Sequence, residues 1–307
     1  MFTADTHCDT LYSLAKGEDP SKLMVSKSKM EKGNVGLQTF AMFTGSKGPK
    51  GTPYQDALDM IACIGRLDIP MLLGRLPEKP PKVPTGIISI EGGEALEGKI
   101  ARLKEFYEKT GLRMIALTWN FENEIGFPAK LGPNPGLKPF GFELLSEMDK
   151  LGIYADVSHL NEQGFWDVVE NMTLPPIASH SNARALCDVP RNLYDDQIKA
   201  VINKGGYIGI NFYTHFLTKT GKSDIEDVLR HIDHIADLGG LDVLGFGSDF
   251  DGIESWPEGL EDSSCFPNLI DALLKHGYTQ NQVENMAGMN LWRLLKKADD
   301  LRNYDEI

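Results

Sequence analysis

The sequence predicts a single (β/α)8 barrel, an α/β fold of the TIM type, and three observations lead to this prediction. Eight short apolar runs rich in β-branched residues alternate with amphipathic, helix-like segments. The runs are nearly continuous in apolar residues, which is typical of parallel strands buried on both faces. Several runs also end in a metal-binding type of residue. The C-terminal strand ends of such a barrel form its active-site face.

The expected strands are spaced so that a helix fits between successive pairs. They are FTADTHCD (2–9), VGLQTFAMF (35–43), TGIISIEGG (85–93), RMIALTWN (113–120), IYADVSH (153–159), PIASHS (176–181), GYIGINFY (206–213) and VLGFGSDF (243–250). Helical periodicity is clearest at 55–67, 161–172 and 224–238. Eight repeats favour closure into a barrel. An open doubly wound sheet is the alternative, but no GxGxxG turn follows the first strand.

Length and charge narrow the class of protein. A barrel of this kind takes about 250 residues, so we expect one domain over residues 1–307. The net charge is −13, and a phosphate backbone or an anionic membrane would repel such a surface. We therefore expect neither nucleic acid nor membrane as a partner.

The chain carries no sign of export or anchoring. MFTADTHCDT at the start lacks a basic stretch and an apolar core, and the ending KKADDLRNYDEI is charged, unlike signal peptides and lipid-anchor signals. The four cysteines, at positions 8, 63, 187 and 265, show no CxxC spacing. They are expected to be free thiols in a reducing compartment, and the expected location is cytoplasmic.

Polar residues end five of the eight expected strands. Each alone has an ordinary explanation, because a strand-end histidine is usually a hydrogen-bonded structural residue and a carboxylate there often caps a helix. Five strand ends together favour a metal site, because the barrel brings them to one face. The residues are His7 and Asp9, Glu91, His159, His180 and Asp249.

The number and spacing of these residues favour two metal ions. Alternate side chains of a strand share a face, so His7 and Asp9 point the same way, Cys8 points away, and Asp5 lies deeper. Even without Asp249, the three histidines and two carboxylates exceed a closed tetrahedral site. They suit two ions about 3.5–4 Å apart that share a carboxylate and a water. Zinc fits this mixture best, and manganese, iron or cobalt fit it less well.

The remaining histidines have simpler explanations. His231 and His234 lie on a helix flank, where they are expected to pair with neighbouring aspartates or solvent. His276 stands at a helix end, where it can meet the last carbonyls. His215, in the loop after the seventh strand, is a weaker candidate for lining the pocket.

Five motifs together resemble those of the membrane dipeptidase family of the amidohydrolase superfamily. They are DTHCDT, SIEGG, ADVSHL, IASHSNAR with the following PRN, and GFGSDFDG, and the resemblance runs from residue 5 to about 295. It implies a zinc-dependent hydrolase that cleaves dipeptides, including some with a C-terminal D-residue, through a hydroxide bridging two zinc ions. The implied partner is a small peptide substrate.

The resemblance also implies a role for each matching residue. His7 and Asp9 resemble the ligands of one zinc ion, and His159 and His180 resemble those of the other. Glu91 resembles the carboxylate that bridges both ions. Arg191 matches the arginine that holds the substrate carboxylate, and Asp249 matches the acid that acts on the shared water and the leaving amine.

The choice of acid is less secure from the residues alone. Asp251 has the same parity as Asp249, but it precedes Gly252 and can shape a turn, whereas Asp249 is expected on the strand.

One motif departs from the family pattern. After the fourth strand, relatives such as the renal enzyme carry a histidine thought to steady the tetrahedral intermediate, and here Trp119 stands in that position. Trp119 offers a single N–H and no charge. Either Asn120, the nearest other donor, replaces the histidine, or the substrate range differs. The loops 122–141 and 255–268 either wall the pocket or are plain surface loops.

Two other functions stay open. A different binuclear metal amidohydrolase would act on cyclic amides, lactones or N-acyl amino acids, and a substrate without a free carboxylate would leave Arg191 unexplained. A barrel that binds metal without turnover is disfavoured by Asp249. The preferred side chains are not predicted, and a homodimer is the default oligomeric state.

Overall fold

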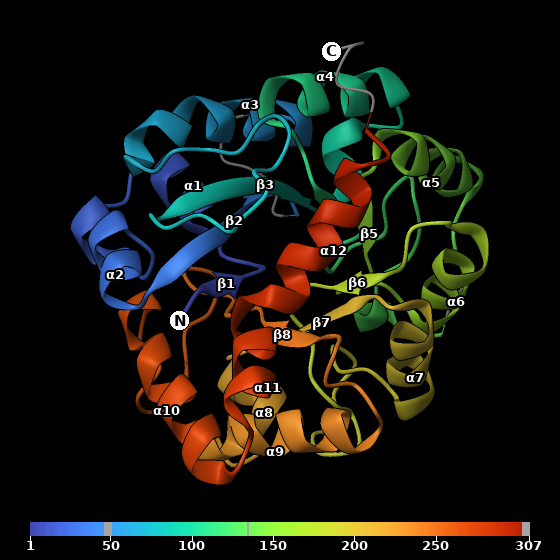
Figure 1. The fold of residues 1–307 in the computed structure, drawn as a ribbon. Helices are drawn as coiled ribbons and strands as arrows, with labels where there is room; N and C mark the ends of the chain where they lie inside the picture. Colours follow the sequence, from blue (N-terminus) through green and yellow to red (C-terminus); the bar gives the residue numbers. More distant parts are fainter. Residues whose placement is uncertain (46–50, 134, 303–307) are drawn as a thin grey trace.

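The strands form a closed barrel in this computed structural model, which describes residues 1–45, 51–133 and 135–302. All eight strands pair in parallel in chain order, and β8 closes the barrel against β1 (Figure 1). The strands are β1 (Thr3–Asp5), β2 (Val35–Phe43), β3 (Thr85–Glu91), β4 (Met114–Ala116), β5 (Tyr154–Asp156), β6 (Ile177–Ala178), β7 (Tyr207–Ile210) and β8 (Leu244–Phe246). The predicted (β/α)8 barrel is confirmed.

Helices surround the barrel and separate successive strands (Figure 1). They are α1 (Thr10–Ala15), α2 (Lys27–Lys32), α3 (Pro53–Cys63), α4 (Ile100–Thr110), α5 (Pro139–Leu151), α6 (Glu162–Asn171), α7 (Asp195–Lys204), α8 (Thr214–Leu217), α9 (Ile225–Asp237), α10 (Phe266–His276), α11 (Gln280–Glu284) and α12 (Asn290–Asp299). The predicted helices 161–172 and 224–238 correspond to α6 and α9. The predicted helix 55–67 corresponds to α3 and a short 3-10 segment, Ile64–Leu67.

Most strands are shorter than the sequence predicts, and only β2 keeps its predicted bounds. Side chains take over the backbone hydrogen bonds where the ladder stops. Asp5 accepts from the backbone N–H of Ser248 at 2.8 Å, and Asp156 accepts from those of Ser158 at 2.9 Å and Ser179 at 3.0 Å. Because these bonds satisfy buried N–H groups, the chain can leave the sheet early. The residues beyond the ladder are therefore loop residues.

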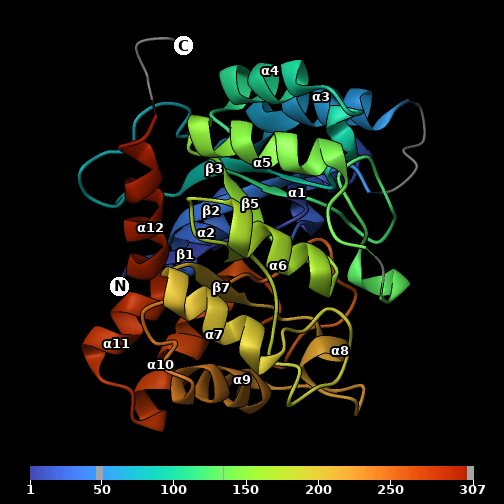
Figure 2. The same ribbon diagram turned by 90° about the vertical axis from the view of Figure 1, so that its right-hand side faces the viewer.

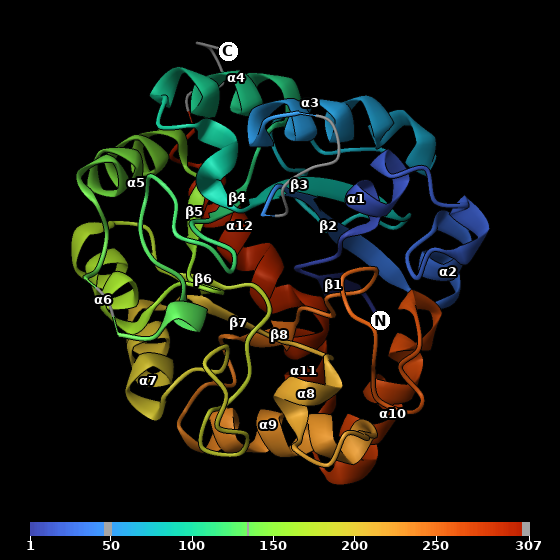
Figure 3. The same cartoon turned by 180° about the vertical axis from the view of Figure 1, so that it is seen from behind.

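The two ends of the barrel differ in what covers them. Helix α12 crosses the end where the strands begin, as Figures 1 and 2 show. Its Trp292 packs edge-on against Phe2 at 6.2 Å between ring centroids, and its Leu294 carbonyl accepts from the Tyr154 hydroxyl at 2.5 Å. The opposite end faces the viewer in Figure 3 and carries α8 and the loops that follow the strands. That end is where a barrel of this type places its active site.

No helix in the described part of the chain is both long enough and apolar enough to cross a membrane.

Candidate metal centre

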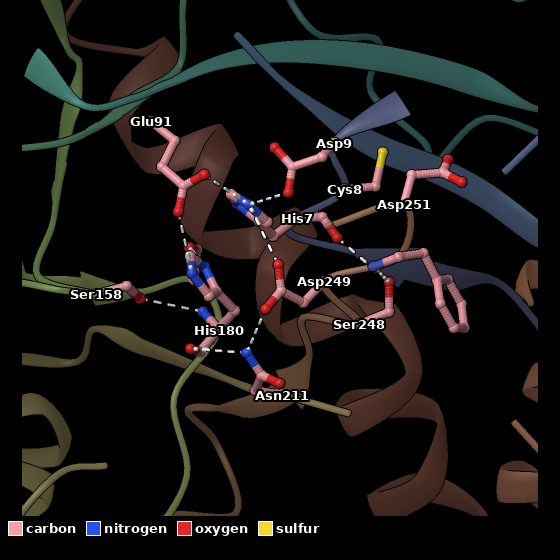
Figure 4. A network of polar contacts seen from close by, with 12 residues as sticks. His7, Cys8, Asp9, Glu91, Ser158, His180, Asn211, Ser248, Asp249 and Asp251 are labelled. Carbon is pink, nitrogen blue, oxygen red and sulfur yellow. Dashed lines mark hydrogen bonds and ion pairs between the residues drawn. The ribbon is translucent and has the colours of Figure 1, made fainter. Parts of the chain in front are cut away.

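The six predicted metal-site residues lie together at the C-terminal ends of the strands. Figure 4 labels all of them except His159 and shows their side chains converging. They come from five different strands or the loops directly after them. Their positions are His7 and Asp9 after β1, Glu91 as the last residue of β3, His159 after β5, His180 after β6 and Asp249 after β8.

The histidines after β5 and β6 both present Nε2 to the interior of the site. His180 Nδ1 lies 2.7 Å from Ser179 Oγ, whose own hydroxyl donates to the Asp156 carboxylate. The Ser179 oxygen therefore accepts the Nδ1–H of His180. His159 Nδ1 lies 3.2 Å from Asn120 Oδ1, which only accepts. These partners assign the proton to Nδ1 in both rings and leave both Nε2 atoms as acceptors.

Three acceptor atoms meet at this point. His159 Nε2 lies 3.1 Å from His180 Nε2 and 2.9 Å from Glu91 Oε1. His180 Nε2 lies 3.5 Å from the same Glu91 oxygen. Lone pairs that face one another at these distances repel unless a cation lies between them. Two neutral imidazoles and a carboxylate are common ligands of divalent metals.

The other Glu91 oxygen belongs to a second group of ligand atoms. Oε2 lies 3.5 Å from His7 Nε2, and Asp9 Oδ2 lies 3.6 Å from the same nitrogen. Both distances are too long for a good hydrogen bond. His7 Nε2 and Asp9 Oδ1 have no hydrogen-bond partner within the described residues although both are buried. Such unsatisfied buried groups are uncommon and fit a missing ligand.

The charges of the site also call for a cation. Burial raises the pKa of Glu91 and of Asp249, because three carboxylates crowd into one buried volume. Burial alone would lower the pKa of His7, but the facing Glu91 and Asp9 carboxylates outweigh it and raise that pKa well above its ordinary value. The proton on His7 thus offsets part of the negative charge. Metal ions would do so more completely, and the residues present fit them.

The pKa values of the other two histidines shift in the opposite direction to that of His7. Burial lowers the pKa of His159 and of His180 well below the ordinary value, and the positive charges of Arg191 and His7 add to this effect. Both rings are therefore neutral, which is the form that binds metals.

The backbone at two site residues is strained. His159 has φ 69° and Asp249 has φ 65°, in the left-handed region that residues other than glycine seldom adopt. The His159 carbonyl accepts from the Ala129 N–H at 2.7 Å, so the loop after β4 fixes this conformation. Beside Asp249, a Cβ on Gly252 would lie 2.0 Å from Asp9 Oδ2, so a larger residue there would force that carboxylate to move. Strain of this kind gathers at functional sites.

The two aspartates after β8 have different surroundings. Asp249 Oδ1 lies 3.8 Å from His7 Nε2, and its Oδ2 accepts from Asn211 Nδ2 at 2.9 Å (Figure 4). Asp251 instead accepts from Thr10 Oγ1 at 2.5 Å and from the Met24 N–H at 2.6 Å, so it ties the loop to α1 and to the segment before α2. The prediction that Asp249 lies on the strand is wrong, because β8 ends at Phe246. The Asp249 oxygen that faces His7 lies close enough to His7 and Asp9 for the three residues to hold a metal ion together.

Arg191 lies beside the ligands and borders a cavity of about 520 Å³. Its Nη2 donates to the His180 carbonyl at 3.2 Å, and its Nε has no partner within the described residues. His159 borders the same cavity, so the cavity connects with the candidate metal centre. Ala129, Gly132 and Pro133 of the predicted wall 122–141 line it, whereas no residue of the predicted wall 255–268, all of them described, does so.

The remaining histidines and Cys8 lie away from the centre, but the predicted histidine partners are wrong. Buried His231 accepts from the Ala183 N–H at 3.1 Å and donates to the Leu217 carbonyl at 3.0 Å. Folding brings distant carboxylates to the other two: His234 pairs with Asp195 at 2.8 Å and His276 with Asp233 at 2.9 Å. His215 is exposed. The Cys8 thiol donates to the Thr39 carbonyl at 3.4 Å, and all four cysteines are free.

Several supporting residues were not predicted from the sequence. Asn211 anchors Asp249, and Ser179 with Asp156 orients His180. Asn211 directly follows β7 and could have been noticed as a polar strand-end residue. An amide is not a usual metal ligand, so a search for ligand types passes over it. Ser179 and Asp156 carry no such signal, because they act through another residue.

Comparison with known proteins agrees with this geometry. The sequence model of the membrane dipeptidase family, Peptidase family M19, matches residues 81–306. The chain belongs to the membrane dipeptidase family. It is therefore an enzyme of a metallopeptidase family, and the resemblance seen in the motifs is confirmed.

Individual relatives cover most of the chain. A protein of Klebsiella pneumoniae, described as uncharacterized and encoded in the pqqA 5′ region, is 38% identical over 71% of this chain and 83% of its own length. An uncharacterized dipeptidase of Schizosaccharomyces pombe is 33% identical over 88% of this chain and 71% of its own.

Solved structures extend the similarity to the whole barrel. Dipeptidase AC, a metallopeptidase of family M19, has a TM-score of 0.88 at 27% identity and covers 97% of this chain and 98% of its own. A metallopeptidase from Rhodobacter sphaeroides, bound to a phosphinate mimic of the dipeptide L-Ala-D-Ala, has a TM-score of 0.87 at 26% identity, over 97% of this chain and 99% of its own.

Proposed function

We propose that this enzyme is a binuclear zinc dipeptidase that hydrolyses dipeptides with a free C-terminal carboxylate, including some whose C-terminal residue is a D-amino acid. The observation that supports this most strongly is the position of Glu91. Its Oε1 faces His159 and His180, and its Oε2 faces His7. One carboxylate thus offers an oxygen to each of two separate groups of ligand atoms.

The ligand types favour zinc at both positions. His7 and Asp9 would hold one ion, His159 and His180 the other, and Glu91 would bridge them; nitrogen and carboxylate ligands are usual for catalytic zinc. Two zinc ions would lower the pKa of a shared water towards neutrality and polarise the carbonyl of the scissile bond.

Asp249 is placed to move the proton in this reaction. Asn211 holds its Oδ2, and the other oxygen, Oδ1, is directed at the ligands. That free oxygen would take the proton from the attacking water and return it to the departing nitrogen, acting first as base and then as acid. The hydrogen bond from Asn211 keeps the carboxylate from turning during the transfer.

Arg191 supports the restriction to free C-termini. Its guanidinium is buried beside the ligands and at the wall of the cavity, so it can meet a carboxylate away from competing water. The planar guanidinium binds a carboxylate through two parallel hydrogen bonds. The L-Ala-D-Ala mimic bound by the Rhodobacter sphaeroides relative supports a D-residue at the C-terminal position.

A substrate panel on zinc-loaded and chelated protein tests the proposal. It contains L,L- and L,D-dipeptides, their C-terminal amides, an N-acyl amino acid, a cyclic amide and a lactone. We expect zinc-dependent hydrolysis of the free dipeptides and a kcat/KM for the amides that is lower by about 30-fold or more, because losing a desolvated charge pair costs about 2–5 kcal/mol. Similar kcat/KM values for amides and free dipeptides would show that Arg191 does not bind the substrate carboxylate.

The same panel distinguishes the proposed dipeptidase activity from that of another binuclear metal amidohydrolase. Preferred turnover of the cyclic amide or the lactone would favour it, and the effect of Arg191→Ala on each substrate shows which of them needs the guanidinium. Arg230→Ala, which removes an exposed arginine paired with Asp227 on α9, is the control and should leave every rate unchanged.

A further inference from the structure

The two histidines that face Glu91 Oε1 are supported in unequal ways. His180 is held by a fully buried relay in which Ser179 Oγ accepts from its ring and donates to the charged Asp156. His159 is held by a neutral amide, the half-buried Asn120, at 3.2 Å. A serine that donates to a carboxylate has its hydroxyl fixed, so it can only accept from His180. An amide has both an acceptor and a donor end, so it can present either to His159.

The orientation of Asn120 decides what His159 presents to the metal position. When Oδ1 faces His159, the ring carries its proton on Nδ1, and the Nε2 lone pair points at the ligand group. The other tautomer of His159, with its proton on Nε2, is also stabilised, because that proton would make a hydrogen bond to Glu91 Oε1 at 2.9 Å. That proton would occupy the metal position, and Asn120 would then turn its NH2 group towards Nδ1. The two arrangements compete, and Asn120 is the residue that chooses between them.

Trp119 explains why Asn120 reaches His159. The indole ring packs against Phe43 at 4.9 Å and against Phe121 at 5.5 Å between centroids. It also lies 6.2 Å from the ring of His159. These contacts fix the segment after β4 above the ligand group, so the next residue, Asn120, meets the imidazole. The pair Trp119–Asn120 thus combines an aromatic anchor with an amide acceptor.

We propose that Asn120 is a positioning residue, which keeps His159 in the form that binds metal by accepting its Nδ1–H through Oδ1. This rests on the proposed metal centre. Partners of ligand histidines fix the ring and its proton, and losing one typically lowers metal affinity about 10–100-fold. Asn120 acts through His159, so its effect falls first on metal binding at that position.

Three variants at one position test this without reference to catalysis. Asn120→Leu keeps the size and removes the acceptor, so one of two zinc equivalents should bind about 10–100-fold more weakly in competition with a chromogenic chelator. Asn120→Asp can only accept when ionised, so it should bind that equivalent at least as tightly as the wild type. Asn120→Ala should resemble Asn120→Leu and replaces it as the test variant if the leucine variant fails to fold. If Asn120 served packing alone, zinc affinity would not fall in the order aspartate, asparagine, leucine at position 120.

A spectroscopic measurement reports on His159 itself. Long-range proton–nitrogen spectra of labelled imidazoles in zinc-free protein show which nitrogen carries the proton. We expect Nδ1 in the wild type and in Asn120→Asp, and a shift towards Nε2 in Asn120→Leu. Asn285→Leu is the matched control, because Asn285 is another half-buried asparagine whose Oδ1 accepts one side-chain hydrogen bond, from Arg293 at 3.0 Å. It should change neither the spectrum nor the affinity.

The outcomes separate this proposal from the proposed function. A wild-type protein that binds no zinc would overturn the metal centre and the role of Asn120 with it. Wild-type affinity in both Asn120→Leu and Asn120→Ala would overturn the role of Asn120 and leave the metal centre in place.

Discussion

The two ends of the barrel bury charge in opposite ways. At the end covered by α12, Arg113 and Asp299 are almost fully buried and form an ion pair at 2.9 Å. Asp299 also accepts from the Leu76 N–H at 3.0 Å. At the other end, the Asp9, Glu91 and Asp249 carboxylates gather around His7, and the charges of His7 and of the nearby Arg191 offset them only in part.

This difference separates the tasks of the two ends. A buried pair that satisfies itself needs nothing more, so it serves stability. A buried group of like charges is costly and persists only where a ligand or a function compensates. In barrels of this type, residues at one end serve stability and residues at the other end serve catalysis. Removing single charges at each end, and measuring stability and activity, tests this difference.

The largest effect is expected for Asp249→Asn. The variant keeps the shape of the side chain and loses the base, so kcat should fall about 10²–10⁴-fold. The zinc-free variant should be no less stable than the wild type, because a carboxylate with a raised pKa destabilises the folded state at neutral pH. Zinc content is measured in parallel: if zinc is lost together with activity, Asp249 is a ligand and not the proton carrier.

The next effect is expected at the opposite end. Asp299→Ala removes the carboxylate that forms the ion pair with the buried Arg113, which should lower the free energy of unfolding by about 3–5 kcal/mol in a denaturant titration. The matched change Asp188→Ala breaks the exposed pair between Asp188 and Arg184 and should cost far less, because solvent screens an exposed pair. Equal losses in the two variants would contradict the importance of burial.

A pH titration of stability adds a third buried group to the comparison, His231 on α9. Burial lowers the pKa of His231 from 6.5 to about 4. The unfolded chain therefore binds this proton first as the pH falls. The contribution is complete above pH 6.5 and is lost on acidification to pH 4, by about 3 kcal/mol in total.

The variant His231→Gln isolates this contribution. Its unfolding free energy should depend less on pH across that window than the wild-type value. His215→Gln, at an exposed position, should keep the wild-type slope. A wild-type slope in His231→Gln would show that other groups cause the acid sensitivity.

The smallest effect is expected from zinc itself. Adding zinc to metal-free protein at about 100 times its Kd should stabilise the fold by about 2.7 kcal/mol, because only the folded state brings the ligands together. Thermal unfolding with and without zinc measures this. Glu91→Gln should lose most of the gain, and an unchanged melting temperature in the wild type would count against the metal centre.

How much the sequence could predict depended on whether a residue's chemistry shows in its type. His7, Glu91 and His180 are ligand types at strand ends, so their convergence followed from the barrel alone. The left-handed backbone of Asp249 did not, because the apolar run 243–250 continues past the last ladder bond and hides the turn.

Contacts between residues far apart in the sequence could not be predicted either. Arg113 and Asp299 lie 186 positions apart, and Asn120 and His159 lie 39 apart. Neither pair has a local pattern that predicts it, since only the closed barrel and the C-terminal helix bring these side chains together. The same holds for the carboxylates that pair with His234 and His276.

The contact between β1 and the residues after β8 joins two segments that are synthesised far apart in time. Ser248 donates to Asp5 at 2.5 Å across 243 positions of sequence. At about 5–20 residues per second, the ribosome makes this stretch in roughly 10–50 s. For most of that time His7 and Asp9 have already been made, while Asp249 and the strand that closes the barrel have not. The growing chain therefore carries part of the candidate metal centre long before it can complete it, and a metal ion captured early would be held by too few ligands.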